Sequence, residues 1–217
     1  MEIIKDYNAQ IHELQRICGK DIHIVWNNML DQISDISSVK LILVGDNPGP
    51  YEFKENIYLS PNGKCGAMAK NFFSKLNLTL HKDVIVLNKT PFHTSKTADL
   101  KKIVNDDTFV QSQTIMAKFA VELLKMCSKN NQNTKLWILG SSQSNFGKNP
   151  LFGQYKKVIQ EMKQNKLWEK IFCYYHFSCG SFHKELYKHM DKKDICDIQI
   201  LQEVLDITGT NRKNLFF

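Results

Sequence analysis

Four short apolar runs, each ending at a polar residue or glycine, constrain the fold of this chain most strongly. They occupy residues 41–44, 84–87, 136–139 and 171–175. Continuous apolar runs of this length are typical of strands buried on both faces of a parallel sheet. Stretches with apolar residues at helical spacing separate the runs, at residues 68–76, 109–127 and 154–168. Because parallel neighbours need long crossover connections, the pattern predicts a three-layer α/β/α fold around a four-stranded, mainly parallel sheet.

The length of 217 residues suits one substantial core better than two. We therefore expect a single domain over residues 1–217. Apolar spacing predicts two N-terminal helices within residues 1–37, the second around residues 26–33, followed by an α/β core over 38–190. Residues 191–217 form a C-terminal extension, and its end, "NRKNLFF", is compatible with a loosely held tail or a packed terminal strand.

The charge balance is basic, with a formal net charge of +7 at pH 7. All the basic residues except Arg16 and Arg212 are lysines. A positive surface favours an anionic partner such as nucleic acid, but surface lysines serve solubility equally well. Charge alone therefore leaves the partner open.

The six cysteines are scattered and contain no C-x-x-C pair. This pattern is typical of reduced, buried thiols, and it predicts neither a disulfide framework nor a metal site. No apolar run approaches membrane-spanning length, and the N-terminus lacks the pattern of a secretory leader. We expect a cytoplasmic, monomeric protein without metal, cofactor or membrane partner.

Polar residues follow the apolar runs and should meet in space, because parallel strands end at one edge of a sheet and ligands bind outside that edge. Asn47, Asn88 and His176 stand out. Amides can read the edge of a planar base, and a histidine can donate to an oxygen that gains negative charge. Each residue alone is also compatible with a turn, cap or core role. Their joint placement favours a functional site.

Three segments resemble, in order, the motifs of the uracil-DNA glycosylase superfamily. They are "GDNPGP" (45–50), "VIVLNKTPFHT" (84–94) and "YYHFSCGSFHKEL" (174–186). The first is similar to the G-x-N-P-G form of the mismatch-specific and single-strand-selective branches. The resemblance covers residues 41–186 and implies hydrolysis of the N-glycosidic bond of uracil, or a related deaminated base, after the base is flipped out of DNA.

The resemblance also implies roles for individual residues. Asn47 falls where the family positions the hydrolytic water, Asn88 where it reads the base, and His176 where it stabilises the leaving base. Tyr58 aligns, more loosely, with an aromatic residue that stacks on the base. Further pocket residues are expected in the first motif, where proline fixes the backbone and glycine leaves room for a base: Gly45, Asp46, Pro48 and Gly49.

The third motif departs from the family pattern. Phe177 stands where the family has proline, and Gly180 stands where a side chain usually enters the vacated base stack. Phe177 or Phe182 could supply an apolar wedge instead. The residues expected to contact DNA are Ser142, Phe177, Ser178 and Ser181.

Other departures concern the superfamily branch. Gly49 replaces the tyrosine that blocks thymine in the narrowest uracil-selective branch. Glu52 and residues 63–66 are similar to the thermophile branch, whose four-cysteine iron–sulfur cluster has no counterpart here. Two alternatives to a DNA glycosylase stay open: a catalytically inactive member that binds nucleic acid, and a hydrolase of free nucleosides or nucleotides.

Overall fold

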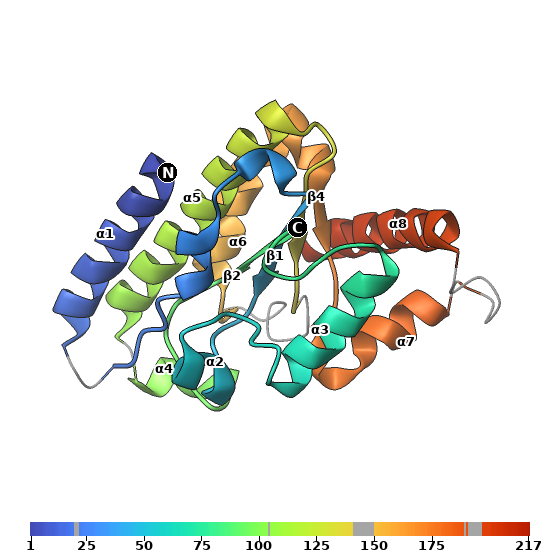
Figure 1. Cartoon of the computed structure of the whole chain (residues 1–217). Helices are drawn as coiled ribbons and strands as arrows, with labels where there is room; N and C mark the ends of the chain where they lie inside the picture. Colours follow the sequence, from blue (N-terminus) through green and yellow to red (C-terminus); the bar gives the residue numbers. More distant parts are fainter. Residues whose placement is uncertain (20–21, 104, 141–149, 189, 191–196) are drawn as a thin grey trace.

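The computed structural model describes residues 1–19, 22–103, 105–140, 150–188, 190 and 197–217 (Figure 1). Its centre is a sheet of four parallel strands in the order β2-β1-β3-β4. The strands are β1 (Leu41–Gly45), β2 (Val84–Asn88), β3 (Lys135–Ile138) and β4 (Ile171–Cys173). The predicted fold class is confirmed, and the strands lie within two residues of the predicted bounds.

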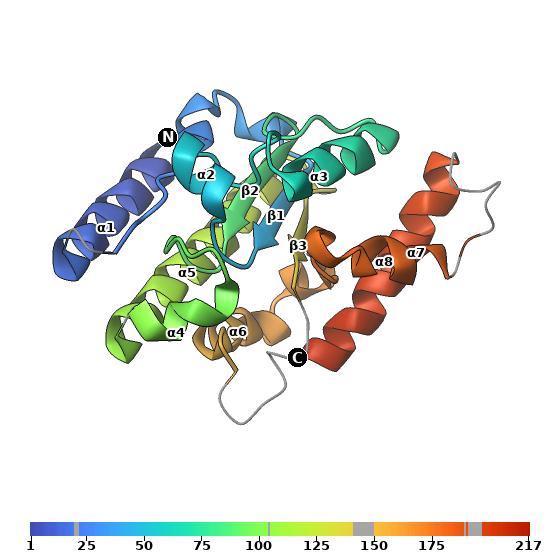
Figure 2. The same ribbon diagram turned by 90° about the horizontal axis from the view of Figure 1, so that it is seen from below.

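Helices cover both faces of the sheet, as Figures 1 and 2 show from two directions. One face carries α1 (Glu2–Cys18), α5 (Asp106–Asn130) and α6 (Gly153–Gln160), which contact one another through α5. The other face carries α3 (Lys64–Lys75), α7 (Ser181–Tyr187) and α8 (Ile198–Phe216). Two short helices, α2 (Pro50–Glu55) and α4 (Leu100–Ile103), lie near the carboxyl ends of the strands.

The N-terminal segment does not form the predicted second helix. Residues Asn28–Gln32 form only a 3-10 turn. The residues before it lie against the outer edge of β2: Ile24 bridges Phe92, and the Asn27 side chain donates to the carbonyl of Val86 at 2.9 Å. Covering an edge strand in this way satisfies polar backbone that would otherwise stay unpaired. Contacts with the edge of the sheet and a short 3-10 turn therefore replace the helix that apolar spacing predicted.

The C-terminal residues are neither a loose tail nor a strand, because they complete α8. Asp197 caps the start of this helix by accepting from the backbone N–H groups of Gln199 and Ile200. Near its end, Lys213 is 5% exposed and donates to the Trp168 carbonyl at 3.0 Å. Because this buried ammonium group is hydrogen-bonded, the polar end of α8 can pack against the residues before β4.

Within the described ranges, none of the helices combines the length and the apolar character that crossing a membrane requires.

Helix α8 approaches β4 closely at Gly209. A Cβ atom at this position would lie 2.4 Å from the Tyr174 hydroxyl and 2.9 Å from Cβ of Phe172. That hydroxyl is held in place because it donates to the Leu205 carbonyl at 2.9 Å. A side chain at position 209 would therefore force the helix away from the sheet.

We expect Gly209→Ala to lower the free energy of unfolding by about 1–3 kcal/mol, because overpacking outweighs the better helix propensity of alanine. Urea denaturation followed by circular dichroism measures the change. The control is Asn211→Ala on the exposed side of α8, expected to stay within about 0.5 kcal/mol of the wild type. Equal stability of the wild type and Gly209→Ala would show that the contact is not tight.

Candidate active site

A small cavity lies at the carboxyl edge of the sheet. Its volume is about 50 Å³, well below the roughly 300 Å³ of small ligand pockets. Asn47, Asn88 and His176 all line it, as predicted from their positions after three different strands. A base could enter only if the cavity opens. The full lining is Leu43, Gly45, Asn47, Glu52, Leu59, Cys65, Val86, Asn88, Leu139 and His176.

His176 is oriented by its own loop. The backbone N–H of Ser178 donates to Nδ1 at 3.2 Å, and the Ser178 hydroxyl lies 2.9 Å from the same nitrogen. Because Nδ1 accepts from a backbone N–H, the neutral ring carries its proton on Nε2. Burial lowers the pKa of His176; Asp46 opposes this shift and Lys89 adds to it. The ring is therefore neutral near pH 7, with its N–H group at Nε2.

The Nε2 atom of His176 lies on the same side of Gly45 as the Asn88 amide. A Cβ atom on Gly45 would be 3.8 Å from Nε2 and 2.4 Å from Oδ1 of Asn88. Only glycine leaves this space open. The backbone of β1 thus forms one side of the cavity, with the imidazole and the amide next to it.

Asn47 is fixed by the segment that follows β2. The Thr97 hydroxyl donates to Oδ1 at 2.6 Å, and Nδ2 donates to Oγ1 of Thr94 at 2.9 Å and to the Pro48 carbonyl at 3.2 Å. These contacts define which end of the amide is the acceptor. An amide oxygen has two lone pairs, and among the described residues only the Thr97 hydroxyl donates to Oδ1, which leaves one position for a water molecule. The two threonines were not predicted, because nothing in their spacing links them to Asn47.

Asn88 is 3% exposed, and its Nδ2 has no hydrogen-bond partner among the residues that the structure describes. Most buried polar groups in folded proteins are paired, so an unpaired donor in a cavity needs an explanation. A ligand carbonyl, or the Glu52 carboxylate that lines the same cavity, would satisfy it. Asn88 is therefore the side chain in the cavity best suited to recognise a polar ligand edge.

Glu52 also lines the cavity, although the sequence indicated only that this position is similar to the thermophile branch. Its two oxygens accept from the backbone N–H groups of Gly49 at 2.6 Å and Leu59 at 2.5 Å. Burial raises the pKa of Glu52, and these two N–H groups act in the opposite direction. The sequence signal was available, because a glutamate three residues after the N-cap residue matches the spacing of a capping box.

Asp46 does not line the cavity but forms an ion pair with Lys89, whose side chain is fully buried. The Lys89 ammonium also donates to the Leu139 carbonyl at 2.6 Å and lies 4.9 Å from the centre of the Phe152 ring. The predicted role of Asp46 in substrate binding is therefore replaced by a structural one. The signal for this pair in the sequence was a lysine between the apolar run at residues 84–87 and the apolar residues Pro91 and Phe92.

Three aromatic residues do not fit their predicted roles. Tyr58 is 0% exposed and its hydroxyl donates to the Val25 carbonyl at 3.0 Å, so it is a core residue that cannot stack on a base. Phe177 is also 0% exposed, and its ring centre lies 4.4 Å from that of Phe182, which is 2% exposed. Both rings pack against Phe72 of α3. Neither phenylalanine is available as a wedge in this conformation.

The remaining predicted residues are placed as follows. Pro48 is buried and Gly49 donates its N–H to Glu52, so both shape the loop rather than the cavity lining. Ser178 is exposed and contacts His176, and Ser181 is the first residue of α7. Ser142 lies outside the described residues.

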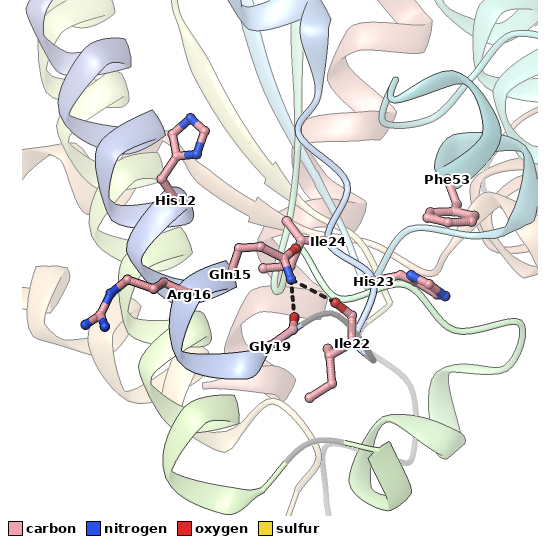
Figure 3. Close-up of a pocket in the computed structure, with 8 residues that line it drawn as sticks. All are labelled: His12, Gln15, Arg16, Gly19, Ile22, His23, Ile24 and Phe53. Atoms are coloured by element: carbon pink, nitrogen blue, oxygen red, sulfur yellow. Dashed lines mark hydrogen bonds between the residues drawn. The ribbon is translucent and has the colours of Figure 1, made fainter.

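A larger groove of about 660 Å³ lies between α1 and residues 22–24 (Figure 3). The Gln15 side chain turns toward the backbone there and donates to the carbonyls of Gly19 and Ile22, and Arg16 pairs with Glu13 on its own helix. These polar groups are engaged in local structure. None of the predicted site residues lines the groove, so we place the candidate active site at the sheet edge.

No group of three histidine, cysteine or acidic residues in the described part of the chain is arranged to hold a metal ion.

No protein-family model matches the sequence, and no curated protein shows significant similarity to it. Function is therefore inferred from the chemistry of the site.

We expect Lys89→Met to lower the free energy of unfolding by about 3 kcal/mol, because it leaves the Asp46 carboxylate without its buried partner. The double variant Asp46→Asn/Lys89→Met should recover most of the loss. Urea denaturation measures both. The control is Lys40→Met, which breaks an exposed pair with Asp83 at 3.8 Å and should cost less than about 1 kcal/mol. A loss no larger than that of the control would contradict a structural role for the pair.

Glu52 should also shape the pH dependence of stability. Because its pKa is raised on folding, the folded state binds the proton more tightly, and stability contributed by Glu52 falls as pH rises through the raised pKa. We expect the stability of the wild type relative to Glu52→Gln to decrease between pH 4 and 7 in urea titrations. Glu55 provides a control of opposite sign, because Ser60 and Asn62 lower its pKa. The wild type should therefore lose stability relative to Glu55→Gln as pH falls.

Proposed function

We propose that this chain is a DNA glycosylase that hydrolyses the N-glycosidic bond of uracil or a related deaminated base. The observation that carries the proposal is the meeting of Asn47, Asn88 and His176 in one cavity at the carboxyl edge of the sheet. An oriented imidazole N–H, an unpaired buried amide and a fixed amide oxygen are the groups that base departure and water addition need.

The proposed reaction begins when a base is flipped out of DNA into the cavity. Asn88 binds its Watson–Crick edge, and Nε2–H of His176 donates to the carbonyl oxygen O2. The bond between C1′ and the base nitrogen then breaks, its electron pair leaves with the base, and the sugar becomes an oxocarbenium-like cation. A water held at Oδ1 of Asn47 adds to C1′, and its proton neutralises the base anion. An amide is too weak a base to drive this addition, so stabilisation of the leaving base supplies most of the catalysis.

The remaining features agree with a nucleic-acid substrate. A net charge of +7, almost all from lysine, suits contacts with the phosphate backbone, which makes binding strongly dependent on salt. The small cavity favours a pyrimidine over a purine, since less opening is needed. We expect the protein to act as a monomer in the cytoplasm.

A second candidate function is nucleic-acid binding without base release. It is favoured by the closing loop, where Phe177 is buried and Gly180 offers no side chain. A protein without a wedge has less means to hold a base outside the stack.

Oligonucleotides that contain uracil in single strands, in U:G pairs and in U:A pairs test the first function, together with xanthine and hypoxanthine substrates. Alkaline cleavage at abasic sites measures base release. We expect release from at least one uracil substrate, and Asn47→Ala and His176→Ala should each reduce the rate at least about 100-fold, as loss of one preorganised group does. Exposed Asn71→Ala and His12→Ala are the matched controls and should keep the wild-type rate.

Three other outcomes point elsewhere. Salt-sensitive DNA binding without base release, unchanged in Asn47→Ala, would support the binding function. Release from mononucleosides but not from oligonucleotides would indicate a hydrolase of free nucleosides. Failure to bind DNA or release any base would overturn both proposals.

A further inference from the structure

The amide of Asn88 can face a ligand in two ways that differ by a rotation of 180°, with either its oxygen or its NH2 group toward a given atom. The difference decides which base fits. Uracil and other deaminated bases carry a lactam N–H on their Watson–Crick edge, whereas cytosine carries an unprotonated ring nitrogen at the same place. A site that selects deaminated bases must therefore hold the amide in one orientation.

The surroundings of Asn88 are unequal on its two sides. Its Oδ1 lies over Gly45, where a Cβ atom would be only 2.4 Å away. On the other side, Nδ2 is buried without a hydrogen-bond partner among the described residues, and the Glu52 carboxylate lines the same cavity. Burial raises the pKa of Glu52, and the nearby Asn88 amide opposes a part of this shift, although the two groups do not reach hydrogen-bond geometry. The reverse orientation would place two oxygens against each other.

Glu52 is suited to impose this orientation because it cannot easily move. Its oxygens accept from the N–H group of Gly49 at 2.6 Å, which precedes it in the chain, and from that of Leu59 at 2.5 Å, which follows it. Each carboxylate oxygen has a further lone pair for another donor. The carboxylate is therefore a fixed acceptor beside the Asn88 NH2 group.

We propose that Glu52 is a positioning residue for base selection: it holds the NH2 group of Asn88 toward its carboxylate and so presents Oδ1 as an acceptor for a lactam N–H. This inference rests on the proposed function and defines its substrate class. Uracil N3–H can donate to Oδ1, whereas N3 of cytosine would meet it as a second acceptor. Glutamine at position 52 would accept or donate equally well, so it would permit both orientations of Asn88.

The first test is independent of catalysis. The side-chain NH2 signals of Asn88 in ¹H–¹⁵N NMR spectra are assigned from their loss in Asn88→Asp. We expect these signals to move or broaden in Glu52→Gln and to stay in place in Glu55→Gln, whose parent residue is on the same helix but bonds Ser60 and Asn62. If Glu52→Gln does not fold, Glu52→Asp keeps the charge, shortens the side chain and should shift the same signals. Unchanged Asn88 signals would overturn the inference, whether or not the protein releases any base.

The second test measures selectivity with matched single-stranded oligonucleotides that contain uracil or cytosine. We expect the ratio of uracil to cytosine release to fall at least tenfold in Glu52→Gln and to stay unchanged in Glu55→Gln. A lower uracil rate with an unchanged ratio would indicate a purely structural role and overturn the inference. Absence of release by the wild type would reject the proposed function, and the NMR result alone would then decide the role of Glu52.

Discussion

The ion pair between Asp46 and Lys89 determines where the two asparagines of the candidate site lie. Asp46 directly precedes Asn47, and Lys89 directly follows Asn88. The pair joins the ends of β1 and β2, and the bond from the Lys89 ammonium to the Leu139 carbonyl joins them to β3. A buried charge without its partner is costly, so the three strand ends have little freedom to separate. The spacing of the amides follows from this constraint.

The other side chains of the site are fixed in the same manner, by hydrogen bonds to neighbouring side chains and backbone N–H groups. Thr94 and Thr97 hold Asn47, Ser178 holds His176, and two backbone N–H groups hold Glu52. Groups that need not reorganise when charge develops are the basis of electrostatic catalysis. Asn88 differs from the others, because its NH2 group has no bonded partner within the described structure.

The sequence was sufficient to predict features that depend on repeating patterns. Apolar runs and helical spacing predicted the layers, and the shared carboxyl edge of parallel strands predicted that residues 47, 88 and 176 would meet. It was insufficient where a side chain's role depends on contacts between distant segments. The burial of Tyr58 and Phe177, the pairing of Asp46 with Lys89 and the course of residues 24–27 all depend on such contacts. The C-terminal helix was missed because its buried Lys213 interrupts the apolar pattern.

The cavity has two sides that differ in how freely their residues can change, and Gly45 belongs to the side formed by the sheet. Main chain and strand residues form one side, and changing them would disturb the core of the sheet. The opposite side is built from the segment that contains Glu52, Leu59 and Cys65, which lies outside the strands. Substitutions in that segment can alter the shape and polarity of the cavity while the sheet stays intact. In the proposed glycosylase, base preference can therefore evolve on one side of the site without loss of the scaffold that carries Asn47, Asn88 and His176.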